Sequence, residues 1–388
     1  MKIVQITPAY KPAYIYGGPT MSVAKLCEAL ASIKADVEVF TTTANGLNEL
    51  DVEPGKTVSI DGVYVTYFKR LTKDHTHFSP TLLWALRRTL NEKPKTKNAL
   101  IIHIHSWWNL VTIFSCLVAK IYQIPVLLSP RGMLTHYTQN NRNSFFKSAL
   151  HHVIGKSLLK YCHILASSEQ EKQNVLQIIK PKSIHVLPNL VSLTTQNNSE
   201  KGETKGEKLF RLLFLSRIEE KKGLELLFEA LALLTIDWRL SIAGSGQTSY
   251  IENLKQKAAQ LNLNDRINWL GQINNEAKFE FIAQHDLLVL TSYNENFANV
   301  VIESLSVGTP VLLSEQVGLS TYVLANDLGF VTDLSPNKIR EAINEAFYDT
   351  IKRNKIRTEA PQIIKNDFDE QKLIQKYLDL YQFILNQN

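Results

Sequence analysis

The sequence predicts an α/β protein of two domains, each a sheet of buried parallel strands connected by helices. The chain has 388 residues, too many for one ordinary core and enough for two domains of about 190 residues each. Short apolar runs alternate with stretches of helical periodicity along most of its length. A polar stretch at 191–208 separates two such series and predicts an interdomain linker. We therefore expect domains at 1–190 and 209–368, with a terminal helix over 369–388.

The expected elements follow from the spacing of apolar residues. In the first domain, helices are expected over 23–30 and 79–90, and a turn-rich connection over 45–62. The second domain is expected to contain a helix that ends at 262 and another over 337–347. The expected strands are 2–7, 37–42, 63–68, 99–104, 125–129, 163–167 and 184–187 in the first domain, and 210–216, 238–243, 267–270, 287–290, 311–313 and 329–331 in the second.

Composition excludes several classes of protein. A hydrophobic content of 44% and a charged content of 21% are typical of globular proteins and exclude large-scale disorder. The three cysteines are odd in number and far apart, which favours a reducing compartment over a disulfide framework. No apolar stretch reaches the roughly 18 residues of a membrane span, and the first residues resemble a strand rather than a signal peptide. We therefore expect a cytoplasmic protein.

The net charge of +6 is unevenly distributed. Residues 1–194 contain 22 lysines and arginines against 11 acidic residues, whereas the remainder contains 21 against 26. A basic half can face an anionic membrane or a nucleic acid, or can simply be a solvated surface. We expect a membrane rather than a nucleic acid, with the protein peripheral at the inner face of the membrane.

One segment of the basic half has an amphipathic pattern. Core packing against the sheet explains this pattern about as well as docking on anionic lipid, and the charge of the whole half favours docking. Its apolar residues recur at helical spacing and its cations lie among them: Phe145, Phe146, Leu150, Val153, Ile154 and Leu158, with Arg142, Lys147, Lys156 and Lys160.

The most informative stretch is the strand-to-helix connection that follows 287–290. Glu295 falls in the loop before the helix and Glu303 in its second turn, where side chains lean back toward the helix N-terminus, so both can reach one ligand. The alternative is that Glu295 caps the helix and Glu303 is solvated. Unpaired amides of the first turn, together with the helix dipole, favour an anion. These amides belong to Phe297, Ala298, Asn299 and Val300.

A second strand-to-helix connection carries cations. Arg217 and Lys222 follow the strand at 210–216 and precede Gly223. Two cations in such a loop suit a diphosphate, because each charge-assisted hydrogen bond contributes about 1.5–3 kcal/mol. Taken alone, both would be ordinary surface charges, and Lys221 leaves open which lysine is in phase.

Glycines follow two strands. The pair Gly17 and Gly18 lies after the first strand, where a backbone without side chains can approach a diphosphate, although such pairs are also common turns. Gly244 and Gly246 follow the strand at 238–243 as a partial Gly-x-Gly. The third glycine of the dinucleotide fingerprint is lacking, so we do not expect NAD binding.

Two histidines and an arginine fall near the ends of first-domain strands. His103 and His105 lie on one face of a strand, and no third metal ligand is evident nearby. His105, at the carboxyl end, is in the position where parallel sheets bind ligands, and a structural role suits His103 better. Arg131 either binds an acceptor phosphate or carboxylate or pairs with a neighbouring acid.

These motifs resemble the nucleotide-sugar glycosyltransferases of family 4, over nearly the whole chain and most strongly over 212–313. Ser-x-x-Glu-Asn-Phe-x-Asn-Val-Val-x-Glu-Ser-Leu-x-x-Gly-Thr-Pro-Val from Ser292 resembles the family's Glu-x7-Glu signature, and Arg217 to Gly223 its Arg-x4-Lys-Gly signature. Ala298 stands where the family more often has Gly, and Ser304 where it more often has Ala. The resemblance implies the GT-B arrangement, in which two Rossmann-like domains face each other across a cleft and a terminal helix crosses back to the first domain.

The resemblance also implies roles for these residues. Glu295 and His105 would contact the transferred sugar, Arg217 and Lys222 would neutralise the leaving diphosphate, and Glu303 would hold the ribose. The amides from Phe297 to Val300 and the glycine pair Gly17 and Gly18 would contact phosphate. The rest of the donor would be contacted by Gly244 and Gly246, and its base would be held through backbone contacts of Gln272 and Ile273.

The function implied is a retaining, metal-independent hexosyltransferase that uses a nucleoside-diphosphate sugar and no cofactor. Its acceptor would be a glycan or a lipid-linked sugar in cell-surface polysaccharide or lipopolysaccharide synthesis, bound by the first domain with Arg131 as a weak candidate. A nucleotide-sugar epimerase and a non-catalytic nucleotide-sugar sensor are the alternatives. Asp367 to Glu370 resembles an Asp-x-Asp metal site of unrelated sugar transferases but fits a helix capping box better.

Overall fold

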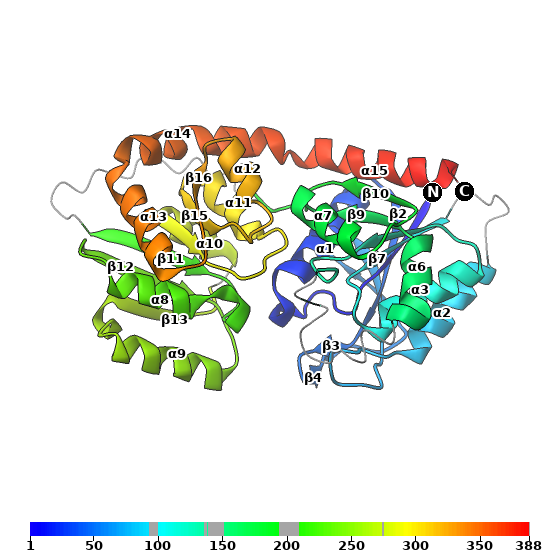
Figure 1. The fold of residues 1–388 in the computed structure, drawn as a ribbon. Coiled ribbons are helices and arrows are strands. Elements are labelled where there is room, and N and C mark those ends of the chain that lie inside the picture. The colour runs from blue at the N-terminus through cyan, green and yellow to red at the C-terminus, as the bar shows by residue number, and fades with distance from the viewer. Residues whose placement is uncertain (93–99, 136–137, 139–150, 194–208, 274, 388) are drawn as a thin grey trace. The chain divides into compact units, whose positions relative to one another are not determined.

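A computed structural model describes residues 1–92, 100–135, 138, 151–193, 209–273 and 275–387 of the protein. The chain divides into two units, one formed by residues 1–190 and 370–388 and the other by residues 191–369 (Figure 1). Each unit is built on a largely parallel sheet with helices, which confirms the predicted α/β fold class of two Rossmann-like domains. Most of the predicted linker, and residues 139–150 of the basic segment, lie outside the described residues.

The described part of the first unit contains an eight-stranded sheet in the order β10-β9-β8-β7-β1-β2-β6-β5. Neighbouring strands are parallel except β5, which runs antiparallel to β6. The strand order reverses between β1 and β7, the place in an open α/β sheet where ligands bind beyond the carboxyl ends. The strands are β1 (Lys2–Ile6), β2 (Asp36–Thr42), β5 (Thr57–Ile60), β6 (Val63–Phe68), β7 (Leu100–His105), β8 (Val126–Ser129), β9 (His163–Ala166) and β10 (Ser183–Val186), with a separate hairpin of β3 (Ala44–Asn45) and β4 (Asn48–Glu49).

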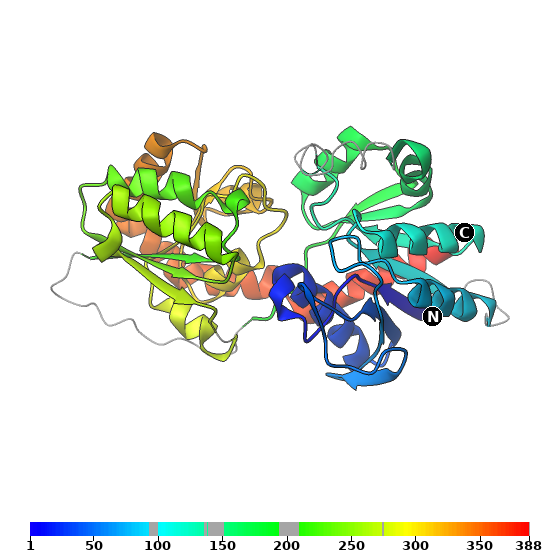
Figure 2. The same ribbon diagram turned by 90° about the horizontal axis from the view of Figure 1, so that it is seen from below.

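Helices lie on both faces of this sheet (Figures 1 and 2). Helix α3 packs against α2 and α6 over a core that includes Ile102 and Ile104 of β7. Because successive side chains of a strand point to opposite faces, His103 and His105 point to the other face, where α15 packs against β7. The helices are α1 (Gly18–Ser32), α2 (Pro80–Asn91), α3 (Leu110–Ile121), α6 (Lys156–Tyr161), α7 (Glu169–Ile178) and α15 (Glu370–Asn386).

Within its described residues, the second unit contains a six-stranded parallel sheet in the order β13-β12-β11-β14-β15-β16. Its order reverses between β11 and β14, so the connections after these two strands lie where a ligand is expected. The strands are β11 (Phe210–Leu215), β12 (Trp238–Ala243), β13 (Ile267–Gly271), β14 (Leu287–Leu290), β15 (Val311–Ser314) and β16 (Gly329–Thr332). The helices are α8 (Leu224–Ala232), α9 (Thr248–Gln260), α10 (Asn275–Ala283), α11 (Asn299–Ser306), α12 (Ser320–Ala325), α13 (Pro336–Tyr348) and α14 (Thr350–Asp367).

Every predicted strand is present, with ends shifted by at most one residue. The turn-rich stretch predicted over 45–62 contains turns, and it also contains β5 and part of the β3–β4 hairpin, which were not predicted. Helices α3, α7, α10, α12 and α14 were not predicted. Helix α3 is apolar on most sides, and α14 contains Pro361, which helices normally exclude from their interior.

The described end of the basic segment divides between core and surface. Leu158 is buried in the first unit's core and Ile154 packs against that core, so the core-packing alternative holds for these two residues. Val153 is 78% exposed, and Lys156 and Lys160 are exposed as well. Among the helices of the described residues, none is long and apolar enough to span a membrane.

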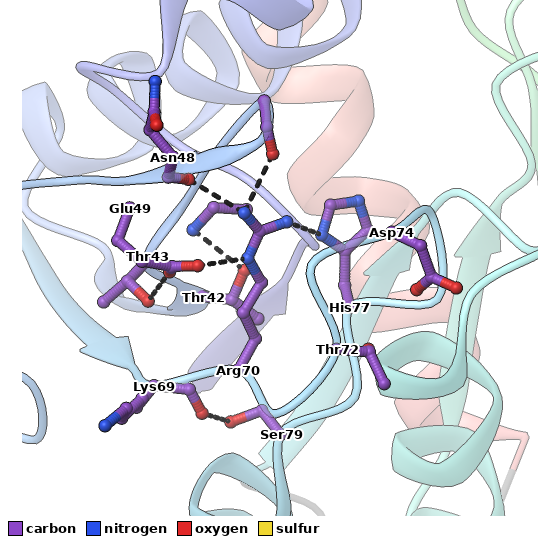
Figure 3. Close-up of polar contacts among 12 residues, drawn as sticks. Thr42, Thr43, Asn48, Glu49, Lys69, Arg70, Thr72, Asp74, His77 and Ser79 are labelled. Carbon is purple, nitrogen blue, oxygen red and sulfur yellow. Dashed lines mark hydrogen bonds and ion pairs between the residues drawn. The ribbon is translucent and has the colours of Figure 1, made fainter.

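Arg70, just beyond β6, holds together two connections at the edge of the first sheet (Figure 3). Its side chain is fully buried, and its Nε donates to Glu49 Oε1 at 2.8 Å. Its Nη2 donates to the carbonyl oxygens of Gly46 and Asn48, both at 2.8 Å, and its Nη1 lies 3.4 Å from His77 Nδ1. Burial and the nearby guanidinium lower the pKa of His77 to about 4, which leaves its ring neutral. Arg70 thereby fixes the β3–β4 hairpin to the connection that leads into α2.

Candidate active site

In the second unit, the two connections at the reversal of the sheet meet through a largely enclosed ion pair. Lys222, at the end of a short 3-10 turn after β11, pairs with Glu295 in the connection after β14. The backbone joins the same connections, since the Tyr293 amide donates to the Lys221 carbonyl at 2.8 Å. Glu295 is held on its other side by backbone bonds to Gln316 and Gly318. The structure thus brings together two of the residues predicted to act on the donor.

Gly223 explains why Lys222, and not Lys221, makes this pair. Its φ is +66°, and a Cβ at this position would lie 2.1 Å from the carbonyl oxygen of Thr291 at the end of β14. Only glycine allows the turn to close this tightly. The turn directs Lys222 inward to Glu295, while Lys221 Nζ lies 3.5 Å from Glu219. The structure thus pairs Lys222, and not Lys221, with Glu295, and which of the two contacts a donor stays a prediction.

The charges around Glu295 favour its ionised form. Burial alone would raise the pKa of Glu295, but attraction to Lys222 and Lys221 outweighs burial and leaves the pKa below its ordinary value. Burial and repulsion from Lys222 and Arg217 lower the pKa of Lys221. Arg217 Nη1 lies 2.6 Å from Glu219 Oε1, and both side chains are about one-third exposed. Arg217 is thus the more accessible cation and Lys222 the more enclosed one.

Helix α11 begins directly after this ion pair. Ala298, its N-cap, has φ 62° and ψ 75°, in the left-handed region that glycine prefers. The position where the family more often has Gly is therefore one where alanine is strained. The first-turn amides predicted to face phosphate, from Phe297 to Val300, lie at this helix start, although Phe297 itself is buried. An anion at these amides would gain from the helix dipole.

Glu303 is paired as well. It is 8% exposed, and Lys278 Nζ of α10 donates to its Oε1 at 2.6 Å. Sequence reasoning missed Lys278, because nothing in its neighbourhood indicates a contact with a residue 25 positions away. The predicted ribose contact of Glu303 stays a prediction, and the ion pair fixes its carboxylate in place.

The other predicted donor contacts lie on neighbouring loops of the second sheet. Gly244 and Gly246 have a packing reason to be glycine, since a Cβ would lie 1.8 Å from the Ser216 carbonyl oxygen and 2.1 Å from that of Ile218, respectively. This close approach fixes the loop after β12 against the loop that carries Arg217. Gln272 and Ile273 follow β13, and Gln272 is exposed. Their ligand contacts stay predictions.

In the first unit, His105 and Arg131 come together at the edge of the sheet. Arg131 Nη2 lies 3.4 Å from His105 Nδ1, and Arg131 Nη1 donates to Asn189. His105 is 1% exposed, with Nε2 2.7 Å from Gln5 Oε1. Both ring nitrogens of His103 are also bonded, to Ser129 and Tyr381, which confirms its structural role.

The sequence left open whether Arg131 binds an acceptor or pairs with a neighbouring acid. In the structure its direct partners are a histidine and a side-chain amide rather than a carboxylate. No described residue forms an ion pair with it. Gly17 has φ 65° and precedes the first residue of α1, Gly18, where a Cβ would meet open space. The contact of this glycine pair with a phosphate stays a prediction. Within the described ranges, no group of three or more His, Cys, Asp or Glu residues is arranged to hold a metal ion.

Comparison with known proteins agrees with this architecture. The model for glycosyltransferase family 4 matches residues 16–195, and the model for glycosyl transferases group 1 matches residues 195–363. Two Rossmann-like units with parallel sheets, matched in succession by these models, define a glycosyltransferase with the GT-B fold. The chain belongs to the glycosyltransferases of family 4.

Individual relatives are distant but cover most of the chain. D-inositol 3-phosphate glycosyltransferase of Pseudarthrobacter chlorophenolicus is 22% identical over 82% of this chain and 78% of its own. GDP-mannose:cellobiosyl-diphosphopolyprenol alpha-mannosyltransferase of Xanthomonas oryzae pv. oryzae is 23% identical over 81% of this chain and 83% of its own. Among solved structures, HepE of Anabaena in complex with UDP has a TM-score of 0.73 and 19% identity, covering 98% of this chain and 99% of its own.

Proposed function

We propose that the protein is a retaining glycosyltransferase that moves a hexose from a nucleoside-diphosphate sugar to a glycan or lipid-linked acceptor. The pathway proposed is the synthesis of a cell-surface polysaccharide or lipopolysaccharide. The observation that carries the proposal is the meeting of Arg217, Lys222, Glu295 and the start of α11 at the reversal of the second sheet. A nucleotide-sugar donor is supported by the GDP-mannose in one relative's name and the UDP bound to HepE.

The proposed chemistry assigns the leaving diphosphate to the second unit. When the bond between sugar and phosphate breaks, negative charge grows on the diphosphate, and Arg217, Lys222 and the first-turn amides of α11 stabilise it. These groups replace a metal ion in the proposal, and no cofactor takes part. Glu295 orients a sugar hydroxyl, and the acceptor oxygen attacks on the face that the diphosphate leaves. Loss of one such preorganised group lowers the rate by about 10²–10³.

The acceptor is assigned to the first unit, where Arg131 is the candidate for an anionic group. The acceptor class is supported by the diphosphopolyprenol in one relative's name. A lipid-linked acceptor would bring the protein to a membrane, and the outer side of α2, α3 and α6 suits a membrane surface. Helix α3 packs against both α2 and α6, and exposed apolar side chains on or next to these helices are Trp84 on α2, Ile121 at the end of α3 and Val153 just before α6. Trp at a lipid interface and lysine or arginine near anionic headgroups are both favourable.

Vesicle binding tests the membrane part of the proposal. The triple change Trp84→Ser, Lys156→Gln and Lys160→Gln should release the protein from vesicles that contain anionic lipid. A control that changes Lys34 and Lys180, two exposed lysines elsewhere in the unit, to Gln should leave binding intact. Equal binding by the wild type, the triple variant and the control would contradict the assignment.

A screen of nucleoside-diphosphate sugars for protection against thermal unfolding tests the donor. A donor at 100 times its dissociation constant stabilises the folded protein by about 2.7 kcal/mol. This protection should be weaker in Arg217→Gln and unchanged in Arg239→Gln, which removes an exposed arginine of β12. Mass analysis of the products then separates transfer to an acceptor from epimerisation of the donor. Absence of protection by every nucleoside-diphosphate sugar would refute the proposal.

A further inference from the structure

Five hydrogen bonds join the edge of the first sheet to the C-terminal helix in one continuous chain. The participants come from β1, β7, β8, the loop after β8 and α15, so residues far apart in sequence form one buried network. In order, the contacts are Arg131 Nη2 to His105 Nδ1 at 3.4 Å, His105 Nε2 to Gln5 Oε1 at 2.7 Å, Gln5 Nε2 to Tyr381 Oη at 3.2 Å, Tyr381 Oη to His103 Nδ1 at 2.8 Å, and His103 Nε2 to Ser129 Oγ at 2.9 Å.

Because arginine can only donate, it sets the donor-to-acceptor direction at one end of this hydrogen-bond network. A guanidinium has N–H donors and no acceptor, so His105 Nδ1 must accept. A neutral imidazole that accepts at Nδ1 carries its proton on Nε2, and this N–H then donates to Gln5 Oε1. The amide orientation of Gln5 follows, because its oxygen is the atom that faces a donor. The opposite orientation would set two N–H donors against each other.

The same reasoning continues to the other end. With its oxygen on His105, Gln5 donates through Nε2 to Tyr381 Oη, and the Tyr381 hydroxyl has its own proton left for His103 Nδ1. His103 then carries its proton on Nε2 and donates to Ser129 Oγ. One donor at Arg131 therefore determines the tautomers of both histidines, the orientation of one amide and the rotation of one hydroxyl.

The argument requires neutral histidines, and their surroundings favour this state. Burial, and after it the charge of Arg131, holds the pKa of His103 well below its ordinary value, and burial, His103 and Arg131 do so for His105. The titratable or charged groups that face this network, from every element packed around it, are Cys27 on α1, His103 on β7, Arg131 after β8, Glu171 on α7, and Tyr377 and Tyr381 on α15. Glu171 is the carboxylate among them, and its Oε1 and Oε2 accept from the amides of Gly132 and Ser167.

Two residues with strained backbone conformations lie in or next to this hydrogen-bond network. Ser106, directly after His105, has φ 72°, and Arg131 has φ 56°, both in the left-handed region that residues other than glycine rarely adopt. Such conformations cost of order 1–3 kcal/mol and persist where the surrounding structure holds them, often at ligand sites. Arg131 is itself one partner of the longest hydrogen bond of the network, and Ser106 directly follows the other partner, His105.

We propose that Arg131 and Gln5 are positioning residues that hold His105 as the neutral tautomer with its proton on Nε2, so that Nδ1 is a hydrogen-bond acceptor for a sugar hydroxyl. This rests on the proposed function. The bond to Gln5 is short and stays in place, whereas the 3.4 Å bond from Arg131 is the weaker one. A hydroxyl that takes over Nδ1 displaces the guanidinium and finds the lone pair already oriented toward it.

The tautomers can be measured without any knowledge of the substrate. In protein with 15N-labelled histidine, long-range proton–nitrogen correlation spectra distinguish the two neutral tautomers and the cation. The His103 and His105 signals are assigned by their loss in His103→Asn and His105→Asn. Both residues should show the Nε2–H pattern, unchanged from pH 5.5 to 8.5. An Nδ1–H pattern at His105, or its protonation near pH 6.5, would overturn the proposal.

Two changes at Gln5 test its part. Gln5→Leu removes the acceptor and leaves only the weak 3.4 Å bond from Arg131 to favour the Nε2–H tautomer, so the His105 spectrum should lose the pure Nε2–H pattern. The kcat/KM should fall about tenfold for the loss of one hydrogen bond. Gln5→Glu keeps the size and an acceptor oxygen but adds a negative charge, so His105 should begin to protonate within the measured range and kcat/KM should acquire a new dependence on pH.

Tyr377→Phe is the matched control. It removes a hydroxyl from the same helix, one that donates to the Pro188 carbonyl at 3.2 Å and lies outside the chain of bonds. Its His105 spectrum and its kcat/KM should match the wild type. If no nucleoside-diphosphate sugar supports activity, the proposed function fails while the tautomers remain measurable. A wild-type His105 spectrum in both Gln5 variants, or wild-type kcat/KM in Gln5→Leu, would overturn the positioning role itself.

Discussion

The Lys222–Glu295 pair predicts a strong energetic coupling within the second unit. The two side chains are 7% and 19% exposed, so changing Lys222 to Met leaves a carboxylate enclosed without its partner. Removing one member of a buried pair costs about 3–5 kcal/mol, and we expect the lower end because Lys221 and Arg217 also attract Glu295. For a unit of this size, about 3 kcal/mol corresponds to a fall in Tm of about 6–12 °C.

Replacing both partners should be far less costly. Lys222→Met with Glu295→Gln leaves no unpaired charge, so the double variant should unfold within about 1 kcal/mol of the wild type. A double-mutant cycle followed by circular dichroism at pH 7 would then give a coupling of at least about 2 kcal/mol, which is the loss of about 3 kcal/mol in Lys222→Met less about 1 kcal/mol in the double variant. The exposed pair Lys255–Glu252 on α9, changed in the same way, should give about 0–0.5 kcal/mol and serves as the control.

The coupling should also depend on pH with a definite sign. The pKa of Glu295 is lower in the folded protein than in the unfolded chain, so the pair's contribution is complete above the unfolded value of about 4.3. It is lost as pH falls below that value through the folded pKa. We therefore expect the coupling to be constant between pH 6 and 8. A coupling below about 0.5 kcal/mol at pH 7, or a double variant as unstable as Lys222→Met, would refute the reasoning.

Three further outcomes are expected. Lys222→Ala should lower kcat by about 10²–10³ and weaken donor binding much less, and equal losses by kinetics and calorimetry would contradict a role with the leaving diphosphate. Arg70→Ala should destabilise the protein by about 3 kcal/mol in denaturant unfolding, because Glu49 and two carbonyl oxygens lose a buried donor. Ala298→Gly should raise stability by up to about 1 kcal/mol, since relief of left-handed strain is partly offset by the flexibility of glycine in the unfolded chain; a loss of stability would contradict the strain.

The strands and the loops that carry the site could be predicted from the sequence because both depend on local patterns. Buried parallel strands are continuous apolar runs, and each run marked its strand to within one residue. The residue types that suit an anion stand directly after these runs, as Arg217 does after β11. Helix α3 lacked such a signal, because its apolar sequence has no polar face to set a period.

The pairing of side chains depends on which strands become neighbours, and no local pattern carries that information. Gln5 lies in the first strand and Tyr381 in the last helix, yet the return of α15 to the first unit brings them to 3.2 Å. Lys278 could not be connected with Glu303 for the same reason. His105 is the instructive case: its place at the end of β7 followed from the strand, whereas its two hydrogen bonds, to Gln5 and Arg131, depend on β1 and β8 lying on either side.

Their ion pairs in the folded protein also distinguish Arg217 from Lys222, two cations that could not be distinguished from the sequence. A diphosphate that binds to either one competes with a carboxylate already present, Glu219 for Arg217 and Glu295 for Lys222. The Arg217 pair is about one-third exposed, so water and salt weaken it and its exchange for phosphate costs little. The Lys222 pair is enclosed, and exchanging it would leave Glu295 without its strongest neighbour. In the proposed function, Arg217 is therefore the cation that would receive phosphate, while Lys222 would act from a fixed position that also orients Glu295 toward the sugar.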